Sequence, residues 1–325
     1  MKKFWLISTS ILLLSGALLT ACTTPAPEPD QISVRLKWAH QTQFAGIYVA
    51  DKEGYYADEN LQVTIEPLDM DRQVTTEYVL AGDNDFAIGA AEEMIVARSE
   101  GQPVQAVAVI FRLNPLVYVA PTSAGINSPA DLAGKTIALS PGQGTYLYQV
   151  MMAHAGVDRS QVNEQEMTVW DIYGCWEEAD MCAQYATNGL ARAIYDGVDT
   201  TTLWPSDYDV PFYADVLFTS DEMITEHPDV VARFVRATLK GWQKAIQDPD
   251  LAVKDTLAFD DSLDQGFQLE AMKMSIPLID TGEDTIGWMK ADIWQSMHDI
   301  LIEQGLIAAP VDLTTVYTNE FVENE

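Results

Sequence analysis

Short stretches of alternating apolar and polar residues recur along the body of the chain, and segments with apolar residues at helical spacing separate them. Residues 32–38 and 61–67 show the alternation typical of strands, and residues 43–53 are predicted to form an amphipathic helix that ends at Gly54. The further elements predicted in this half are helix 74–81, strand 86–89, helix 90–100, and strands 104–110 and 116–120. Strands that alternate with helices of about ten residues predict an α/β fold with a largely parallel sheet.

The pattern restarts near Ser128, where a capped turn leads into a new strand. The elements predicted from there are strand 136–139, helix 146–155, strand 167–171, short elements at 183–189 and 191–195, strand 216–219, and helices 228–247, 252–259, 269–274 and 293–304. We therefore predict two α/β lobes, the second inserted into the first. Lobe one comprises residues 31–115 and 217–325 with the C-terminal helices, and lobe two comprises residues 116–216. Ligands of open α/β sheets bind beyond the carboxyl ends of the strands, so a cleft between the lobes is the expected site.

The N-terminal residues 1–21 have the pattern of a secretory signal peptide. Two lysines precede an apolar run that is short for a bilayer core, and small residues follow it. The end of this segment, Leu19-Thr20-Ala21-Cys22, resembles the lipobox of bacterial lipoproteins, which implies cleavage before Cys22 and a lipid on its thiol. Residues 22–30 are proline-rich and predict an extended tether. We expect an extracytoplasmic protein that is anchored to the cell membrane by this lipid.

Composition and charge exclude several classes of protein. Hydrophobic residues make up 48% of the 325 residues, which is typical of a globular chain and excludes disorder, collagen and coiled coil for its bulk. The 49 acidic and 18 basic residues give a net charge of -31, so nucleic acid is excluded as a partner by charge repulsion. The histidines show no metal-ligand spacing with one another or with the cysteines, so no metal site is predicted. Besides Cys22 there are Cys175 and Cys182, which form either a disulfide, as an oxidising compartment favours, or two buried free thiols.

Several stretches of the body resemble one family of binding proteins. They include Lys37-Trp38, Gln43-Phe44-Ala45-Gly46-Ile47-Tyr48, Gly54-Tyr55-Tyr56, Phe86-Ala87-Ile88-Gly89, Asn114-Pro115-Leu116-Val117, the Asp131-Leu132-Ala133-Gly134-Lys135 turn and Asp215-Val216-Leu217-Phe218-Thr219. They are similar to the solute-binding proteins of ABC importers that take thiamine pyrimidine precursors, sulfonates, nitrate or riboflavin. The resemblance implies a two-lobed periplasmic-binding-protein fold of type II, a small-molecule ligand, no cofactor, and permease and ATPase subunits as partners. The loops at 140–146, 170–180 and 186–189 depart from the family pattern.

Candidate ligand-binding residues follow from residue chemistry and from this resemblance. Trp38 ends the first strand and is placed either to stack on a heteroaromatic ring or to pack in the core. Glu92 and Glu93 begin a helix, where their carboxylates either accept hydrogen bonds from a ring amine or complement the helix dipole. Asn114 is an amide contact or an ordinary turn residue. The glycine-rich stretch at 142–146 offers N–H groups at a helix start. The remaining candidates are Gln43, Phe44, Gln143, Tyr146, Trp170, Tyr185, Asn188 and Asp215, and Trp176 is either a lid or a surface residue.

These residues favour a monomeric binding protein that performs no chemistry of its own. The expected ligand is a small heteroaromatic, first of all a thiamine pyrimidine precursor, with riboflavin, an alkanesulfonate or nitrate as alternatives. A pyrimidine-synthase-like enzyme is the second hypothesis, but the cysteine-rich motif of such enzymes is absent and no nucleophile motif occurs. A ligand-sensing subunit coupled to a membrane kinase is a third.

Overall fold

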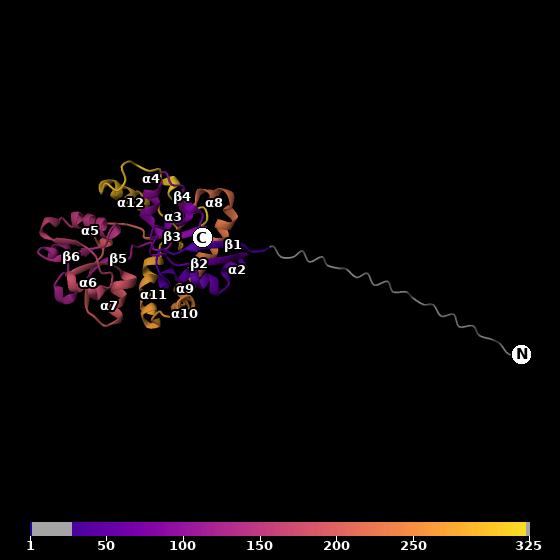
Figure 1. Cartoon of the computed structure of the whole chain (residues 1–325), viewed down its shortest axis with the longest axis horizontal. Coiled ribbons are helices and arrows are strands. Elements are labelled where there is room, and N and C mark those ends of the chain that lie inside the picture. Colours follow the sequence, from indigo (N-terminus) through magenta and orange to yellow (C-terminus); the bar gives the residue numbers. More distant parts are fainter. Residues whose placement is uncertain (2–27, 323–325) are drawn as a thin grey trace.

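The structure is a computed structural model, and it describes Met1 and residues 28–322. The predicted signal peptide beyond Met1, the predicted lipidation site Cys22 and the predicted tether up to residue 27 lie outside the described residues. Within the described part, the strands form two five-stranded sheets, each covered by helices (Figure 1).

The first sheet is built from both ends of the described chain. Its spatial order is β2-β1-β3-β10-β4, formed by β1 (Asp30–Arg35), β2 (Leu61–Glu66), β3 (Phe86–Ala90), β4 (Val104–Val109) and β10 (Asp215–Ser220). The second sheet has the order β7-β6-β8-β5-β9, formed by β5 (Leu116–Pro121), β6 (Thr136–Leu139), β7 (Asn163–Glu166), β8 (Met181–Tyr185) and β9 (Thr200–Leu203). The chain therefore crosses between the sheets after β4 and again before β10.

Both sheets are largely parallel, as expected, but each contains one antiparallel strand that the sequence pattern did not predict. In the first sheet β10 runs antiparallel between β3 and β4, and in the second β5 runs antiparallel between β8 and β9. These two strands lie next to the two crossings between the sheets. An apolar alternation predicts which face of a strand is buried but carries no information on strand direction.

Twelve α-helices cover the sheets in the described residues. They are α1 (Ala45–Lys52), α2 (Tyr55–Asp58), α3 (Thr75–Ala81), α4 (Ala91–Ser99), α5 (Gln143–His154), α6 (Ile172–Glu178), α7 (Ala191–Tyr195), α8 (Asp221–Glu226), α9 (Pro228–Gln247), α10 (Pro249–Leu257), α11 (Gln265–Ile279) and α12 (Ala291–Glu303). The strand predicted at 167–171 is wrong, because the edge strand β7 precedes it. All four residues of β7 are polar and exposed, so this strand leaves no apolar alternation to detect.

The longest helix, α9, shows how the core of the first sheet is packed. Its first turn begins with Pro228, whose fixed φ suits a helix start, and its apolar residues recur at helical spacing. Trp242 of α9 lies against α1 at Gly46, where an added Cβ would come within 2.2 Å of the indole. Close approach of α1 and α9 therefore requires glycine at this position. This packing fixes the start of α1, which follows directly on the segment that leads from β1.

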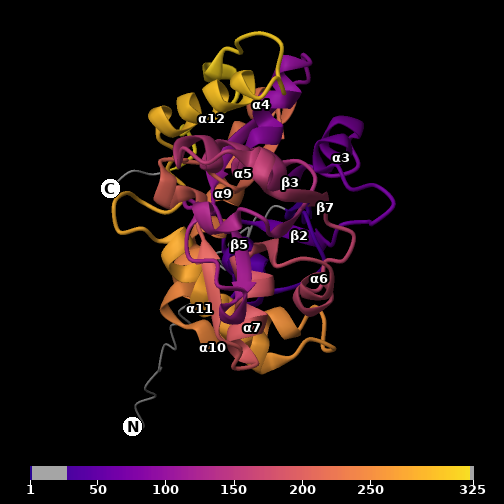
Figure 2. The same cartoon turned by 90° about the vertical axis from the view of Figure 1, so that its left-hand side faces the viewer.

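Helix α11 links the two lobes, one around each sheet. It comes from the C-terminal part of the chain and contacts α7 in the lobe of the second sheet, as Figures 1 and 2 show. The hydroxyl of Tyr195 in α7 donates to Asp264, the cap residue of α11, at 3.2 Å. The Tyr195 ring lies 6.2 Å from the Phe267 ring of α11. These contacts hold the second sheet beside the first at the rim of the cavity described next.

Candidate functional site

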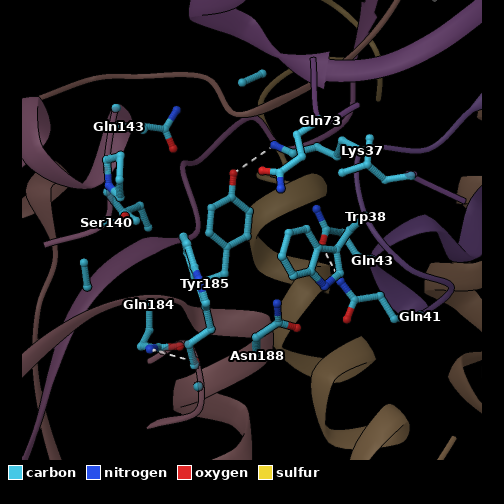
Figure 3. Close-up of a pocket in the computed structure, with 18 of the residues that line it drawn as sticks. Lys37, Trp38, Gln41, Gln43, Gln73, Ser140, Gln143, Gln184, Tyr185 and Asn188 are labelled. Atoms are coloured by element: carbon cyan, nitrogen blue, oxygen red, sulfur yellow. Dashed lines mark hydrogen bonds between the residues drawn. The ribbon is translucent and has the colours of Figure 1, made fainter. Parts of the chain in front are cut away.

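A cavity of about 660 Å³ lies between the two sheets. Its walls come mostly from segments that follow the carboxyl ends of strands: Lys37 and Trp38 after β1, Glu92 after β3 and Gln143 after β6. Tyr185 ends β8 and lies opposite Trp38 and Lys37 in Figure 3. The position agrees with the general rule that α/β sheets bind ligands beyond the carboxyl ends of their strands, and the volume suits a small organic molecule.

Eight of the residues singled out in the sequence line this cavity. They are Trp38, Gln43, Glu92, Glu93, Gln143, Trp170, Tyr185 and Asn188. Four others do not line it. Phe44 is 1% exposed and packs in the core of the first sheet, because it stands at the start of α1 with its ring turned inward. Asn114 performs ordinary turn chemistry: it accepts from the N–H of Leu116 at 2.9 Å and donates to the carbonyl of Tyr213.

Tyr146 and Asp215 are buried behind the cavity wall. Tyr146 packs in the core, 5.8 Å from the Phe212 ring. Burial, followed by the nearby Glu92 charge, raises the pKa of its hydroxyl well above the usual value. Asp215 is 1% exposed and reaches the cavity only through the side chains it holds. Trp176 is not a lid, since its indole N–H donates to the carbonyl of Val119 at 3.1 Å, away from the cleft.

A charge pair between the part-buried Lys37 and the buried Asp215 stands at the wall of the cavity. The Lys37 ammonium donates to Oδ1 of Asp215 at 2.9 Å and to the Tyr185 hydroxyl at 3.1 Å. Burial alone lowers the pKa of Lys37, but the Asp215 carboxylate and Tyr185 outweigh it, so that this pKa stands well above the usual value. The amide of Gln43 donates to Oδ2 of Asp215 at 2.7 Å. Lys37 therefore stays charged, and it joins the first sheet to Tyr185 of the second.

Two carboxylates line the cavity beside this pair. Burial, and next the neighbouring Glu93 charge, raises the pKa of Glu92 to about 7. Burial also raises the pKa of Glu93, against the opposing effect of Lys37. Oε2 of Glu92 in α4 accepts from the side-chain amide of Gln143 in α5 at 2.9 Å, a further hydrogen bond between the two lobes. Both carboxylates accept hydrogen bonds from a ligand when they are ionised.

Aromatic rings and a distorted helical turn complete the walls. The rings of Trp38 and Trp170 lie 6.4 Å apart. A π-helical turn, Ala186–Leu190, follows β8 and carries Asn188 into the cavity. Such single turns occur frequently at functional sites. A disulfide between Cys175 and Cys182 ties α6 to β8, which is the simpler of the two interpretations of these cysteines.

The sequence matches the family described as NMT1/THI5 like over residues 41–252, more than half of the chain. The chain belongs to the NMT1/THI5-like family. It is 26% identical over 350 aligned positions to a riboflavin-binding protein of Chloroflexus aurantiacus, covering 99% of both chains. It is 29% identical over 336 positions to a formylaminopyrimidine-binding protein of Halalkalibacterium halodurans, covering 95% of this chain and 97% of the relative.

Solved structures confirm the predicted fold class. The periplasmic aliphatic sulphonate binding protein of Escherichia coli superposes with a TM-score of 0.72 at 14% identity, covering 91% of this chain and 100% of the other. At that identity the likeness concerns the fold alone. The described residues thus have the two-lobed periplasmic-binding-protein fold, with the cavity between the lobes.

Several lining residues were not predicted from the sequence. They are Lys37, Gln41, Gln73, Gln184 and Arg192. Lys37 lies in the predicted strand 32–38 and in a stretch that carries the family resemblance. A charged lysine among the apolar residues of that strand is the feature that could have identified it. Among the described residues, no group of three or more His, Cys, Asp or Glu side chains is arranged to hold a metal ion. Within the same residues, none of the helices combines the length and apolarity needed to span a membrane.

Proposed function

We propose that this chain is the solute-binding subunit of an ABC importer and that its cleft captures a small heteroaromatic molecule, first of all a thiamine pyrimidine precursor. The observation that carries the proposal is the cavity between the lobes, where two tryptophans, three carboxylates, one ammonium group and one guanidinium group meet. The formylaminopyrimidine-binding relative, which aligns along nearly the whole chain, supports this ligand class. Binding closes the lobes over the ligand, and no chemistry follows.

Each wall of the cavity has a part in this proposal. A heteroaromatic ring stacks on Trp38, which follows β1 at the floor of the cleft. Ring amines donate to Glu92 and Glu93, whose charged forms gain from such partners. Asn188 reaches the opposite edge of the ring from the π-helical turn. We propose Trp38, Gln43, Glu92, Glu93, Gln143, Trp170, Tyr185 and Asn188 as the binding residues, with Asp215 acting through Lys37 and Gln43.

Riboflavin is the second candidate ligand. A cavity of about 660 Å³ leaves room beyond a single pyrimidine ring. The riboflavin-binding relative also matches over the full length of both chains. A free sulfonate or nitrate is less favoured, because Asp215 balances the charge of Lys37, Asp196 pairs with Arg192, and three further carboxylates line the same cavity.

A thermal-shift panel tests the proposed function. The purified protein is heated with formylaminopyrimidine, hydroxymethylpyrimidine, thiamine, riboflavin, taurine or nitrate. A ligand at 100 times its Kd adds about 2.7 kcal/mol to the free energy of unfolding, which raises the midpoint visibly. A shift with a pyrimidine supports the first candidate, and a shift with riboflavin alone supports the second. A folded sample that responds to none of the heteroaromatics contradicts the proposal.

The remaining parts of the proposal concern the setting of the cleft. We propose that residues 1–21 direct export, that a lipid on Cys22 anchors the chain outside the cell membrane, and that residues 22–30 tether the body. We place lobe one at 31–115 and 217–325 and lobe two at 116–216. The protein acts as a monomer that docks onto permease and ATPase subunits. The short tether keeps the body close to a partner embedded in the same membrane.

A further inference from the structure

We infer that Lys37 is the specificity-determining residue of the cleft, that its ammonium group selects heteroaromatic ligands bearing a carbonyl oxygen, and that Asp215 is the residue that positions it. This inference rests on the proposed function and narrows the ligand within it. Lys37 is not among the binding residues proposed above.

The hydrogen bonds of Lys37 leave one donor for a ligand. A lysine ammonium carries three N–H donors and no acceptor. Asp215 takes one of them and the Tyr185 hydroxyl takes a second. In the part of the chain that the structure describes, no protein group accepts the third, and Lys37 lines the cavity. Figure 3 shows its nitrogen directed towards Tyr185 across the cavity.

Tyr185 supplies a second donor for the same ligand atom. Its oxygen accepts from Lys37, so its own O–H is free to donate, and the residue lines the cavity. Burial raises the pKa of this hydroxyl well above the usual value, so the proton is retained. An oxygen with two lone pairs, such as a carbonyl, fits between the two donors. Tyr185 belongs to the second sheet, so lobe closure completes this pair of donors.

Asp215 acts by orientation and not by contact with the ligand. It does not line the cavity, and both of its oxygens are engaged, one by Lys37 and the other by Gln43. The side-chain oxygen Oε1 of Gln43 in turn accepts from the side-chain Nε2 of Gln41 at 2.6 Å. This bond fixes the direction of the Gln43 side-chain amide. One buried carboxylate thus orients two residues of the cavity wall.

The surrounding charges favour a neutral carbonyl over an anion. The charged and titratable groups that face Lys37 are Asp215 of β10, Tyr185 of β8 and Glu93 of α4. Asp215 balances the ammonium, and Glu93 with Glu92 makes the local field negative. A sulfonate or nitrate is repelled there, whereas a ring amine has no acceptor on Lys37. A ligand therefore needs donors for the carboxylates and an acceptor oxygen for Lys37.

Binding measurements on a matched pair of pyrimidines test this inference. Formylaminopyrimidine and hydroxymethylpyrimidine share the ring and its amine, but only the first carries a carbonyl. We expect the wild-type protein to bind the formyl compound at least tenfold more tightly, and Lys37→Met to remove that preference. Riboflavin, which carries ring carbonyls, is measured in parallel and is expected to bind Lys37→Met at least tenfold more weakly. Lys52→Met, which removes a lysine charge from α1 away from the cavity, is the matched control and keeps wild-type affinities.

A pH profile separates positioning by Asp215 from a merely structural role. In Asp215→Asn the ammonium loses its balancing carboxylate, so burial lowers the pKa of Lys37. Affinity for the carbonyl ligand then falls between pH 7 and pH 10 in this variant, while the wild-type protein shows no such fall. A flat profile in a folded Asp215→Asn variant overturns the positioning role.

The remaining outcomes distinguish the two proposals. Binding of pyrimidines with no preference for the carbonyl, or a preference that survives Lys37→Met, overturns this inference and leaves the proposed function intact. Equal affinity of riboflavin for the wild-type protein and Lys37→Met also overturns this inference and leaves the proposed function intact. A folded wild-type protein that binds neither pyrimidine nor riboflavin overturns both. If Lys37→Met does not fold, Tyr185→Phe replaces it, with a smaller loss of the same preference expected.

Discussion

The indole rings of Trp38 and Trp170 lie 6.4 Å apart at the cavity, with their planes tilted by 52°. Trp38 follows β1 in the lobe of the first sheet, and Trp170 precedes α6 in the lobe of the second sheet. The two rings therefore come from opposite lobes and bracket the space between them. Trp170 is 58% exposed, so its ring is available to a ligand at the mouth of the cavity.

Substitution of Trp38 tests whether these two rings hold the ligand. We expect Trp38→Ala to weaken binding of the heteroaromatic by about 1–3 kcal/mol, the usual cost of losing one stacking ring. Isothermal titration calorimetry measures the affinity, and the thermal midpoint of the free protein is recorded alongside. Trp176→Ala is the control, because this tryptophan bonds to Val119 outside the cavity and affects stability alone. Unchanged affinity with a large loss of stability in Trp38→Ala would identify the ring as core packing.

The raised pKa of Glu92 predicts a pH dependence of stability. The pKa of glutamate in an unfolded chain is about 4.3. Burial and the charge of Glu93 raise the pKa of Glu92 in the folded protein to about 7. The folded state therefore holds this proton more tightly than the unfolded state. The resulting stabilisation is complete below the unfolded value and is lost as pH rises through about 7.

Glu92→Gln isolates this contribution, because an amide does not titrate. We expect the wild-type free energy of unfolding, relative to that of the variant, to rise between pH 8 and pH 5. The rise is on the order of 3 kcal/mol from a shift of this size. Denaturant unfolding at both pH values gives the difference. Parallel pH profiles for the two proteins would contradict the prediction.

The elements that the sequence predicts well are those whose burial pattern is local. Helix α9 was placed at 228–247, the bounds that the structure has, because its apolar stripe and its initial proline are both local signals. β7 was missed because it is an exposed polar edge strand. The direction of β10 was missed because it depends on where the chain returns from the second sheet.

The cavity residues divide in the same way. Trp38 and Glu92 were found because an aromatic and an acidic residue that follow predicted strands are visible in the sequence, and Tyr185 was found through the family resemblance. Lys37 was missed because its role depends on Asp215, which lies 178 residues further along the chain. Asp215 itself was named as a contact, but burial turned it into a support for its neighbours.

The disulfide between Cys175 and Cys182 predicts a sensitivity to reduction. It joins residues seven apart in sequence, and both side chains are buried. A cross-link that closes so short a loop contributes about 2 kcal/mol by loop-closure entropy. We expect Cys175→Ala with Cys182→Ala to lower the free energy of unfolding by at least this amount. Reducing agent should lower the wild-type midpoint and leave the double variant unaffected, and a wild-type midpoint insensitive to reduction argues against the bond.

Membrane attachment through Cys22 gives the last prediction. The net charge of -31 opposes attraction to an anionic membrane surface as an alternative source of attachment. We therefore expect Cys22→Ser to move the protein from the membrane pellet to the soluble fraction in cell fractionation. The Cys175→Ala and Cys182→Ala double variant keeps Cys22 and serves as the control that stays in the pellet. Continued sedimentation of Cys22→Ser with membranes would show that another contact holds the protein there.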